Sequence, residues 1–199
     1  SPLIHNTAFI HHGIDAVYVP FLARNAEAFW RACGGWIDGL SITIPHKHAL
    51  LQVVDRLEPL AMRIGAMNTI CRDGHNRTMG ANTDATAAIQ CLESLLGSLH
   101  GRTVTLLGAG GVSRGIAFAL ADRGAKIVIA NRGRERAEEL AKEVGARAMD
   151  LDKATGVAYD ALINGTAVGM DDPGSSPWPA SAHRSGTVVF DTVYTPLET

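Results

Sequence analysis

The stretch TVTLLGAGGVSRG, residues 103–115, carries the clearest fold signal in the chain. A run of apolar and β-branched residues ends in Gly108, Gly110 and Gly111, and a helical pattern follows. Glycines at a strand-to-helix junction permit a tight turn and let the backbone approach a pyrophosphate, which then rests on the first N–H groups of the helix. Ser113 stands where the strict G-x-G-x-x-G pattern has its third glycine, so a plain structural turn stays open as an alternative.

The residues that follow this turn repeat the alternation of helix and strand. Apolar positions recur at helical spacing in two segments, and short apolar runs rich in β-branched residues lie between and after them. This alternation is typical of a parallel, doubly wound sheet, so residues 99–199 are expected to form a Rossmann-like domain. The expected helices cover residues 113–124 and 135–145, and the expected strands lie within 125–132, 159–165 and 186–194.

Basic residues follow the second expected strand of this domain. The sequence there is NRGRER, with Asn131, Arg132, Arg134 and Arg136. An NAD-selective site usually has an acidic residue here for the ribose hydroxyls, whereas arginines provide planar donors and fixed positive charge for a 2′-phosphate. The alternative is that these residues are only the solvated start of a helix. Positively charged side chains are unfavourable there, because the N-terminal end of the helix dipole is itself positive. We therefore expect NADP in preference to NAD.

The first half also alternates between strand and helix patterns. Residues 1–98 are expected to form a separate α/β domain, with the boundary at the short linker between Gly97 and Gly101. Strands are expected at residues 14–20 and 37–45 and as two short strands around the Asp-Gly turn of residues 68–81. Helices are expected at 25–35, over the apolar spacing Leu50, Leu51, Val54 and Leu57, and at 83–97, where Ala88, Ile89, Leu92, Leu95 and Leu96 point inward.

Three side chains in this half are candidates for chemistry. In the strand 37–45, Thr43 points away from the face formed by Leu40, Ile42 and Ile44. Lys47 follows that strand, and a surface charge is its plainer interpretation. Asp84 occupies a position where a helix N-cap belongs, so capping competes with a catalytic role. Taken together, lysine and aspartate could exchange a proton with a reacting hydroxyl, and Asn68 could hydrogen-bond a polyol.

Composition excludes several classes of partner. The formal charge of −2 provides no positive field for nucleic acid, and no apolar stretch approaches the roughly 20 residues that span a bilayer. Cys33, Cys71 and Cys91 are odd in number and widely spaced, and the histidines lack acidic or thiol partners at ligand spacing, so neither disulfides nor a metal is expected. We expect a cytoplasmic protein with a small-molecule substrate.

Eight motifs in collinear order resemble the shikimate dehydrogenase family along essentially the whole chain. The resemblance implies NADP-dependent interconversion of 3-dehydroshikimate and shikimate, a step toward aromatic amino acids and chorismate, with the substrate in a cleft between two α/β domains. The motifs are SPLIHNTAF (1–9), GLSITIPHK (39–47), GAMNTI (65–70), GANTDA (80–85), LLGAGGVSRG (106–115), ANR (130–132), INGTAVGM (163–170) and FDTVYTPLET (190–199).

The resemblance also implies roles for individual residues. Lys47 and Asp84 match the family's catalytic pair, and Lys47 would protonate the carbonyl oxygen in the reducing direction. The substrate would contact Ser1, Thr43, Asn68 and Tyr194. The cofactor would contact Gly108, Ala109, Gly110, Gly111 and Val112 through its diphosphate, Asn131, Arg132 and Arg136 through its adenosine phosphate, and Thr166, Met170 and Val193 near ribose and nicotinamide.

The sequence departs from the family pattern in three places. Gly133 replaces the usual threonine after Asn-Arg, and the neighbouring Arg134 is the candidate to compensate. The family's first strand, with a carboxylate-binding serine, and its last helices, with a ligand-binding glutamine, have no counterpart here, so the chain is interpreted as a segment, or as a module of a longer pathway protein. A quinate/shikimate dehydrogenase and a catalytically inactive, ligand-sensing homologue stay open as alternatives.

Overall fold

The structure, a computed structural model, describes residues 1–43 and 45–195. The chain divides into two compact units, Ser1–Ile37 and Asp38–Thr199. The larger unit contains two sheets, one of four strands and one of five. The mixed α/β content predicted from the sequence is confirmed.

The smaller unit contains two helices, α1 (Pro2–His12) and α2 (Ala26–Cys33). The α2 prediction is confirmed, because the Asn25 side chain accepts a hydrogen bond from the backbone of Ala28 and caps the helix. The strand expected at residues 14–20 is wrong. The side chain of Asn6 on α1 instead donates to the carbonyl of Tyr18 and accepts from its N–H. In a sheet, these two backbone groups would bond to a neighbouring strand. Helix α1 was not predicted.

The four-stranded sheet has the order β1-β3-β4-β2. Its strands are β1 (Gly39–Ser41), β2 (Arg56–Leu57), β3 (Thr69–Arg72) and β4 (Thr78–Ala81). The predicted hairpin is confirmed, because β3 and β4 pair antiparallel. In the expected strand 37–45, only β1 joins the sheet, but the alternation holds: Ile42 is buried, while Ser41 and Thr43 are exposed. Ile44 lies outside the described residues.

The helix predicted over Leu50 to Leu57 is wrong. Residues 45–55 form successive turns whose backbone bonds span three residues, such as Ala49 N–H to His46 O and Val53 N–H to Leu50 O. Leu50 is buried as the apolar spacing required, but Asp55 accepts hydrogen bonds from the backbone and the hydroxyl of Thr78 at 2.7 and 2.8 Å. These hydrogen bonds to β4 fix the chain at the start of β2. The tertiary contact therefore prevents the helix that the apolar spacing predicts.

Helices α3 (Pro59–Ile64) and α4 (Thr83–Leu96) both contact α5 (Gly111–Asp122). Helix α4 was predicted, and Ala88, Ile89 and Leu92 are buried as expected. Leu95 is 68% exposed, so its predicted inward position is wrong. Leu99, just beyond the helix, is buried in that core.

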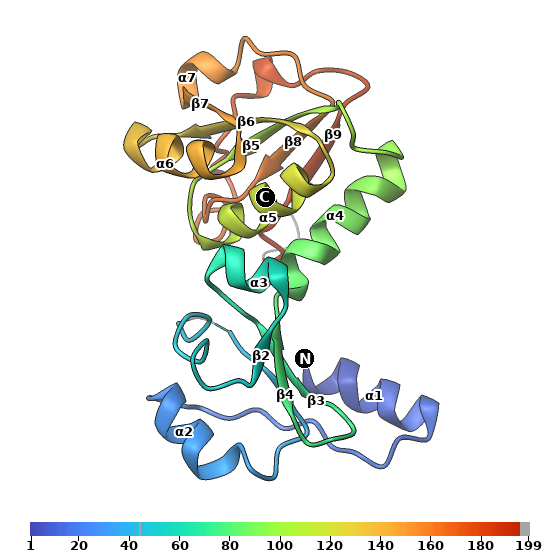
Figure 1. Cartoon of the computed structure of the whole chain (residues 1–199). Coiled ribbons are helices and arrows are strands. Elements are labelled where there is room, and N and C mark those ends of the chain that lie inside the picture. Colours follow the sequence, from blue (N-terminus) through green and yellow to red (C-terminus); the bar gives the residue numbers. More distant parts are fainter. Residues whose placement is uncertain (44, 196–199) are drawn as a thin grey trace. The chain divides into compact units, whose positions relative to one another are not determined.

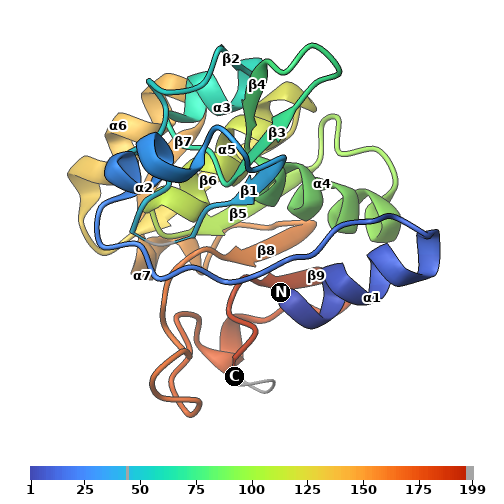
Figure 2. The same cartoon turned by 90° about the horizontal axis from the view of Figure 1, so that it is seen from below.

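The five-stranded sheet is parallel throughout, with the order β7-β6-β5-β8-β9 (Figures 1 and 2). This confirms the parallel sheet and the βα units predicted from the glycine-rich stretch. Strand β7 and helix α7 were not predicted. The strands are β5 (Thr103–Leu107), β6 (Lys126–Asn131), β7 (Arg147–Asp150), β8 (Ala161–Asn164) and β9 (Val188–Asp191), and the further helices are α6 (Arg134–Val144), α7 (Leu151–Ala154) and a 3-10 helix (Ala180–Ala182).

Side chains alternate between the two faces of this sheet, as the period of a strand requires. Leu106, Ile129 and Ile163 join a core with residues of α4, α5 and α6, whereas the adjacent Leu107 and Leu162 pack with Trp178 and with α7. Each such aliphatic side chain stabilises the fold by about 1.5–3 kcal/mol. Both faces are therefore covered, and the carboxyl ends of β5, β6 and β8 meet at one edge, where ligands bind in such sheets.

Candidate active site

Lys47 and Asp84 form an ion pair, with Nζ 2.6 Å from Oδ2. The two side chains are 25% and 51% exposed, so the pair is open to solvent and to a ligand. Asp84 is not the cap of α4. That cap is Asn82, whose side chain accepts a hydrogen bond from the Ala85 backbone at 3.3 Å. The carboxylate of Asp84 is thus available to Lys47, and it stands in the first helical turn, where the helix dipole favours negative charge.

Two hydrogen bonds fix the loop that carries Lys47. The backbone of Met67 donates to the carbonyl of Lys47 at 2.9 Å, and the ring of His48 contacts the carbonyl of Gly65 at 2.6 Å. A carbonyl only accepts, so Nδ1 of His48 carries the proton in this contact. Lys47 is therefore positioned by hydrogen bonds to the segment that follows α3, and not by strand β1, which ends at Ser41.

Asn68 directly precedes β3, and its side chain contacts the start of α4, the helix that carries Asp84. Its Oδ1 accepts hydrogen bonds from the backbone of Thr83 and the hydroxyl of Thr69, each at 2.9 Å, and its carbonyl accepts from the backbone of Ile42. Asn68 thereby connects the residue before Asp84 to the residue before Thr43, which is exposed. The structure brings Lys47, Asp84 and Asn68 into one region.

Ser1 and Tyr194 are exposed. Ser1 precedes α1 in the smaller unit and makes no side-chain capping bond. Tyr194 is 84% exposed and follows the buried Val193, whose backbone donates to the carboxylate of Asp191 at 2.8 Å. Within the described part of the chain, no hydrogen bond joins Tyr194 to the Lys47 region.

The glycine-rich turn shows why glycine is needed and how Ser113 replaces a third one. Gly108 has φ +95°, and a Cβ there would lie 2.9 Å from Cγ2 of Thr166. Ser113 is fully buried and donates to the carbonyl of Gly165 at 3.0 Å. A Cβ on Gly165 would clash with the Ser113 side chain, so the glycine that allows close packing of α5 has moved to the loop after β8.

The start of α5 is formed by two glycines with open space around them. Gly110 occupies the N-cap position and Gly111 begins the helix, and a Cβ on either would meet no atom within 4 Å. Val112 is exposed and Ala109 half-buried. Open space thus lies beside the N-terminal end of a twelve-residue helix, where the first N–H groups are, and this fits the group that the sequence implied.

Residues 131–136 line a pocket of about 520 Å³ beyond β6. Asn131 donates to the carbonyl of Gly133 at 2.8 Å and shapes the turn. Arg134 pairs with Glu138 at 2.6 Å, and this carboxylate raises the pKa of the guanidinium. Among the described contacts Arg132 and Arg136 have no ion pair, so these two, rather than Arg134, remain available for a phosphate.

Asn164, which sequence reasoning missed, organises the loop after β8. Its Oδ1 accepts from the backbone and hydroxyl of Thr166 at 3.0 and 2.7 Å, and its Nδ2 donates to Asp191 on β9 at 3.0 Å. Met170, further along this loop, is half-exposed. Asparagine at the end of a buried strand, directly before a glycine, was the available sequence signal.

Three features define the class of protein as an α/β dehydrogenase that uses a dinucleotide. They are a parallel sheet with an open glycine turn, an arginine-lined pocket beyond the second strand of that domain, and a lysine–aspartate pair. No group of three potential metal ligands occurs among the residues the structure describes. Over the same residues, no helix is long and apolar enough to cross a membrane.

Comparison with known proteins identifies the family. Residues 1–70 match the model of the shikimate dehydrogenase substrate binding domain, and residues 90–170 match that of shikimate / quinate 5-dehydrogenase. Shikimate dehydrogenase (NADP(+)) of Bacillus cereus (strain G9842) is 39% identical over 212 residues, covering 100% of this chain and 76% of the relative. The chain belongs to the shikimate dehydrogenase family.

Two further comparisons bear on function. The crystal structure of shikimate 5-dehydrogenase from Thermus thermophilus in complex with NADP(H) and shikimate has a TM-score of 0.84 and 35% identity, over 98% of this chain and 74% of that one. The chloroplastic bifunctional 3-dehydroquinate dehydratase/shikimate dehydrogenase of Arabidopsis thaliana is 39% identical, over 98% of this chain and 36% of the relative.

Proposed function

We propose that this protein interconverts 3-dehydroshikimate and shikimate with NADP as cofactor, in the synthesis of aromatic amino-acid precursors. The observation that carries the proposal is the 2.6 Å contact between Lys47 and Asp84, formed by two of the family's motifs at distant positions in the chain. Membership of the family and its NADP-dependent relatives supports the cofactor.

In the reducing direction, Lys47 donates a proton from Nζ to the carbonyl oxygen of the substrate. NADPH, when bound, supplies the hydride. Asp84 holds Nζ in place, and the partial exposure of both side chains leaves Lys47 in contact with solvent, the source of its next proton. In the oxidising direction Lys47 accepts the proton of the hydroxyl.

Four polar residues are proposed to bind the substrate. Asn68 and Thr43 hydrogen-bond its ring hydroxyls, Ser1 holds its carboxylate, and Tyr194 lies near the same ligand. The support for Asn68 is its place beside the start of α4, in the hydrogen-bond network that includes Thr83. The support for the other three is the match of their motifs with the family.

The cofactor is proposed to lie along the carboxyl edge of the parallel sheet. Its diphosphate would rest on the glycine turn, and its adenosine phosphate would pair with Arg132 and Arg136. The open space at Gly110 and Gly111 and the unpaired state of both arginines among the described contacts support this. The contacting residues are Gly108, Ala109, Gly110, Gly111, Val112, Asn131, Arg132, Arg136, Thr166, Met170 and Val193.

The proposed domains are residues 1–98 for the substrate and residues 99–199 for NADP. In support, every strand of the four-stranded sheet precedes this boundary and every strand of the five-stranded sheet follows it. A role as a module of a longer pathway protein is supported by the bifunctional relative. Three free cysteines support a cytoplasmic location.

Two other functions are weighed against this proposal. The description shikimate / quinate 5-dehydrogenase keeps quinate as an alternative substrate. A ligand sensor without catalysis needs binding but no proton donor, and the preformed lysine–aspartate pair favours the enzyme.

A panel of substrates and cofactors separates these functions. Purified protein is incubated with shikimate or quinate, each with NADP⁺ or NAD⁺, and formation of the reduced cofactor is followed by absorbance. We expect the highest kcat/KM for shikimate with NADP⁺. A higher value for quinate would favour the quinate enzyme, and shikimate binding without turnover would favour the sensor.

A further inference from the structure

We infer that Arg114 is a positioning residue for the Lys47–Asp84 pair. It acts through the connector, defined as residues 63–67, which links the helix of the glycine turn to the loop of Lys47 and to the cap of α4. The inference rests on the proposed function, because it assigns Arg114 a part in that reaction.

The guanidinium of Arg114 is held from several sides. Its Nη1 and Nη2 pair with both carboxylate oxygens of Glu143 at 2.6 and 2.7 Å, and its Nε donates to the carbonyl of Ile64 at 2.8 Å. Nη2 also donates to the carbonyl of Arg63 at 3.3 Å. The pairing raises the pKa of Arg114 and lowers that of Glu143. The planar fork of arginine can make these contacts together, and lysine cannot.

The same connector holds the acid–base pair through its next three residues. The carbonyl of Gly65 accepts from His48 at 2.6 Å, and the backbone of Met67 donates to the carbonyl of Lys47 at 2.9 Å. The carbonyl of Ala66 accepts at 3.1 Å from Asn82, the cap of α4. Arg114 therefore hydrogen-bonds to one end of the five-residue connector. The other end of the connector orients Lys47 and the helix that carries Asp84.

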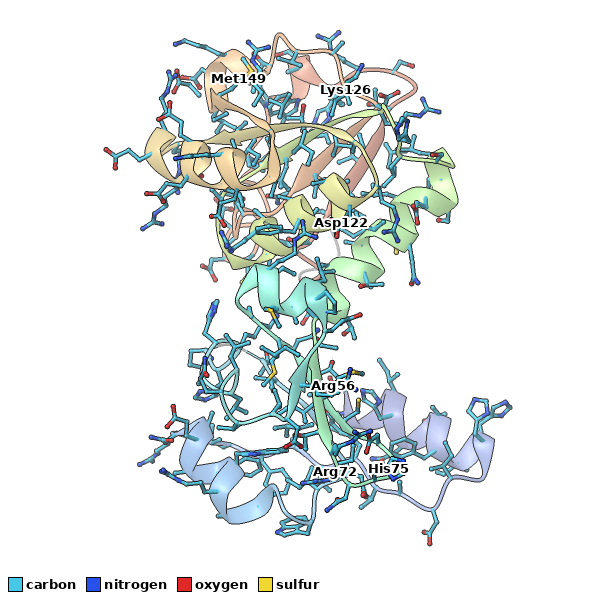
Figure 3. All side chains as sticks on the ribbon, in the orientation of Figure 1. Arg56, Arg72, His75, Asp122, Lys126 and Met149 are labelled. Atoms are coloured by element: carbon cyan, nitrogen blue, oxygen red, sulfur yellow. The ribbon has the colours of Figure 1, made fainter. Side chains whose placement is uncertain are left out.

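Close packing between helices reinforces this connection. Arg63 forms an ion pair with Asp122 of α5 at 2.6 Å, and Figure 3 labels Asp122 on that helix. Both Arg63 and Arg114 stack over the ring of Phe118, each 5.0 Å from its centroid. A Cβ on Gly115 would lie 3.4 Å from that of Ala85, so glycine allows α5 to approach α4 closely.

A small displacement of the connector is expected to reduce turnover more than binding. Catalytic groups misplaced by about 1 Å can lose on the order of 100-fold in rate. Without the Arg114 fork, the carbonyls of Arg63 and Ile64 lose their protein donor, and the connector can shift together with Lys47. Arg114 itself contacts none of the residues proposed to bind substrate or NADP among the described side-chain hydrogen bonds.

A double-mutant cycle tests the inference. R114M and R114K are made in the wild-type protein and in a Lys47→Ala background, and R102M is the matched control, since Arg102 pairs with Asp160 and contacts the carbonyl of Leu96. For R114M we expect kcat to fall about tenfold or more, with KM for shikimate and the Kd of NADP⁺ within about threefold. R114K should recover little of this, and R102M should keep wild-type kcat.

The K47A background separates positioning from general destabilisation. If Arg114 acts through Lys47, R114M lowers the residual kcat of K47A by less than about twofold. Equal losses in both backgrounds, or no loss in either, would overturn the inference. If R114M fails to fold, Glu143→Gln, which removes the carboxylate that holds the guanidinium and so weakens its bonds to the carbonyls of Arg63 and Ile64, serves in the same cycle with the same expected outcomes. Wild-type protein without turnover would instead contradict the proposed function.

Discussion

Lys47 is the residue on which the proposed chemistry depends most, because its ammonium group is the proton donor. Lys47→Ala removes that donor and is expected to lower kcat by about 10²- to 10⁴-fold, while KM for shikimate changes much less. Steady-state kinetics at saturating NADP⁺ measure both values. A change confined to KM would mean that Lys47 only binds the substrate.

Asp84 and Asn82 provide a matched pair of substitutions at the start of α4. Asp84→Asn removes the charge beside Lys47 and is expected to reduce kcat by about tenfold or more with little effect on stability, because Asp84 is not the cap. Asn82→Ala removes the cap and is expected to lower the free energy of unfolding by about 1 kcal/mol. Kinetics and urea unfolding of both variants check these outcomes, and a larger loss of stability in Asp84→Asn would return the capping role to Asp84.

The arginines after β6 are expected to differ in their effect on cofactor choice. Arg136→Ala and Arg132→Ala remove charges that have no ion pair among the described contacts, and each should lower the NADP⁺ to NAD⁺ ratio of kcat/KM about tenfold or more. Arg134→Ala, whose guanidinium is paired with Glu138, should change the ratio less. An equal effect of all three would place Arg134 in the phosphate site.

Sequence reasoning proposed Lys47 and Asp84 because their motifs are short and local. It could not separate the cap of α4 from its neighbour, since Asn82, Thr83 and Asp84 are all common at helix starts. Arg114 was unassigned for a different reason. Its partners Ile64 and Glu143 lie 50 and 29 positions away, and no periodicity encodes such pairs.

At the scale of elements, βα units were predicted more accurately than irregular segments. Strands β5 and β6 and helix α5 have complete local signals: an apolar run, a glycine turn and helical spacing. The helix predicted over Leu50 to Leu57 had the spacing too, but the contacts of Asp55 with β4 determine the chain path there. Apolar periodicity predicted that Leu50 is buried, and did not predict the backbone that buries it.

Asp55 makes the stability of the fold around residues 45–55 depend on pH. Hydrogen bonds from the backbone and hydroxyl of Thr78 lower the pKa of Asp55 below its ordinary value of 3.8. The carboxylate therefore stabilises the folded state above about pH 4, and this contribution is lost as pH falls through the lower, folded-state pKa.

Asp55→Asn should consequently be less stable than wild type at pH 7, with the difference shrinking as pH falls below about 4. The free energy of unfolding in urea, measured from neutral pH down through this range, is the test. A difference that stays constant with pH would mean that the carboxylate charge is not what holds residues 45–55.

For the whole molecule, the sequence predicted a parallel sheet and the family, and the structure and comparisons confirm both. Local sequence patterns did not predict the order of strands along the sheet, β7-β6-β5-β8-β9, or the separate compact unit Ser1–Ile37. Both depend on which distant segments pair, as with Asn6 and Tyr18, where a side chain replaces a strand partner. The domain boundary at residues 98 and 99 stays a prediction.

The most direct measurement is NADPH oxidation in the presence of 3-dehydroshikimate, followed by the absorbance of the reduced nicotinamide, with shikimate identified as the product. The full protein and a variant carrying both Lys47→Ala and Asp84→Asn are compared under the same conditions. We predict substrate-dependent oxidation with a kcat of about 1–10³ s⁻¹ for the protein and almost none for the variant. Equal rates in the two proteins, or no shikimate formed by either, would contradict the proposed reaction.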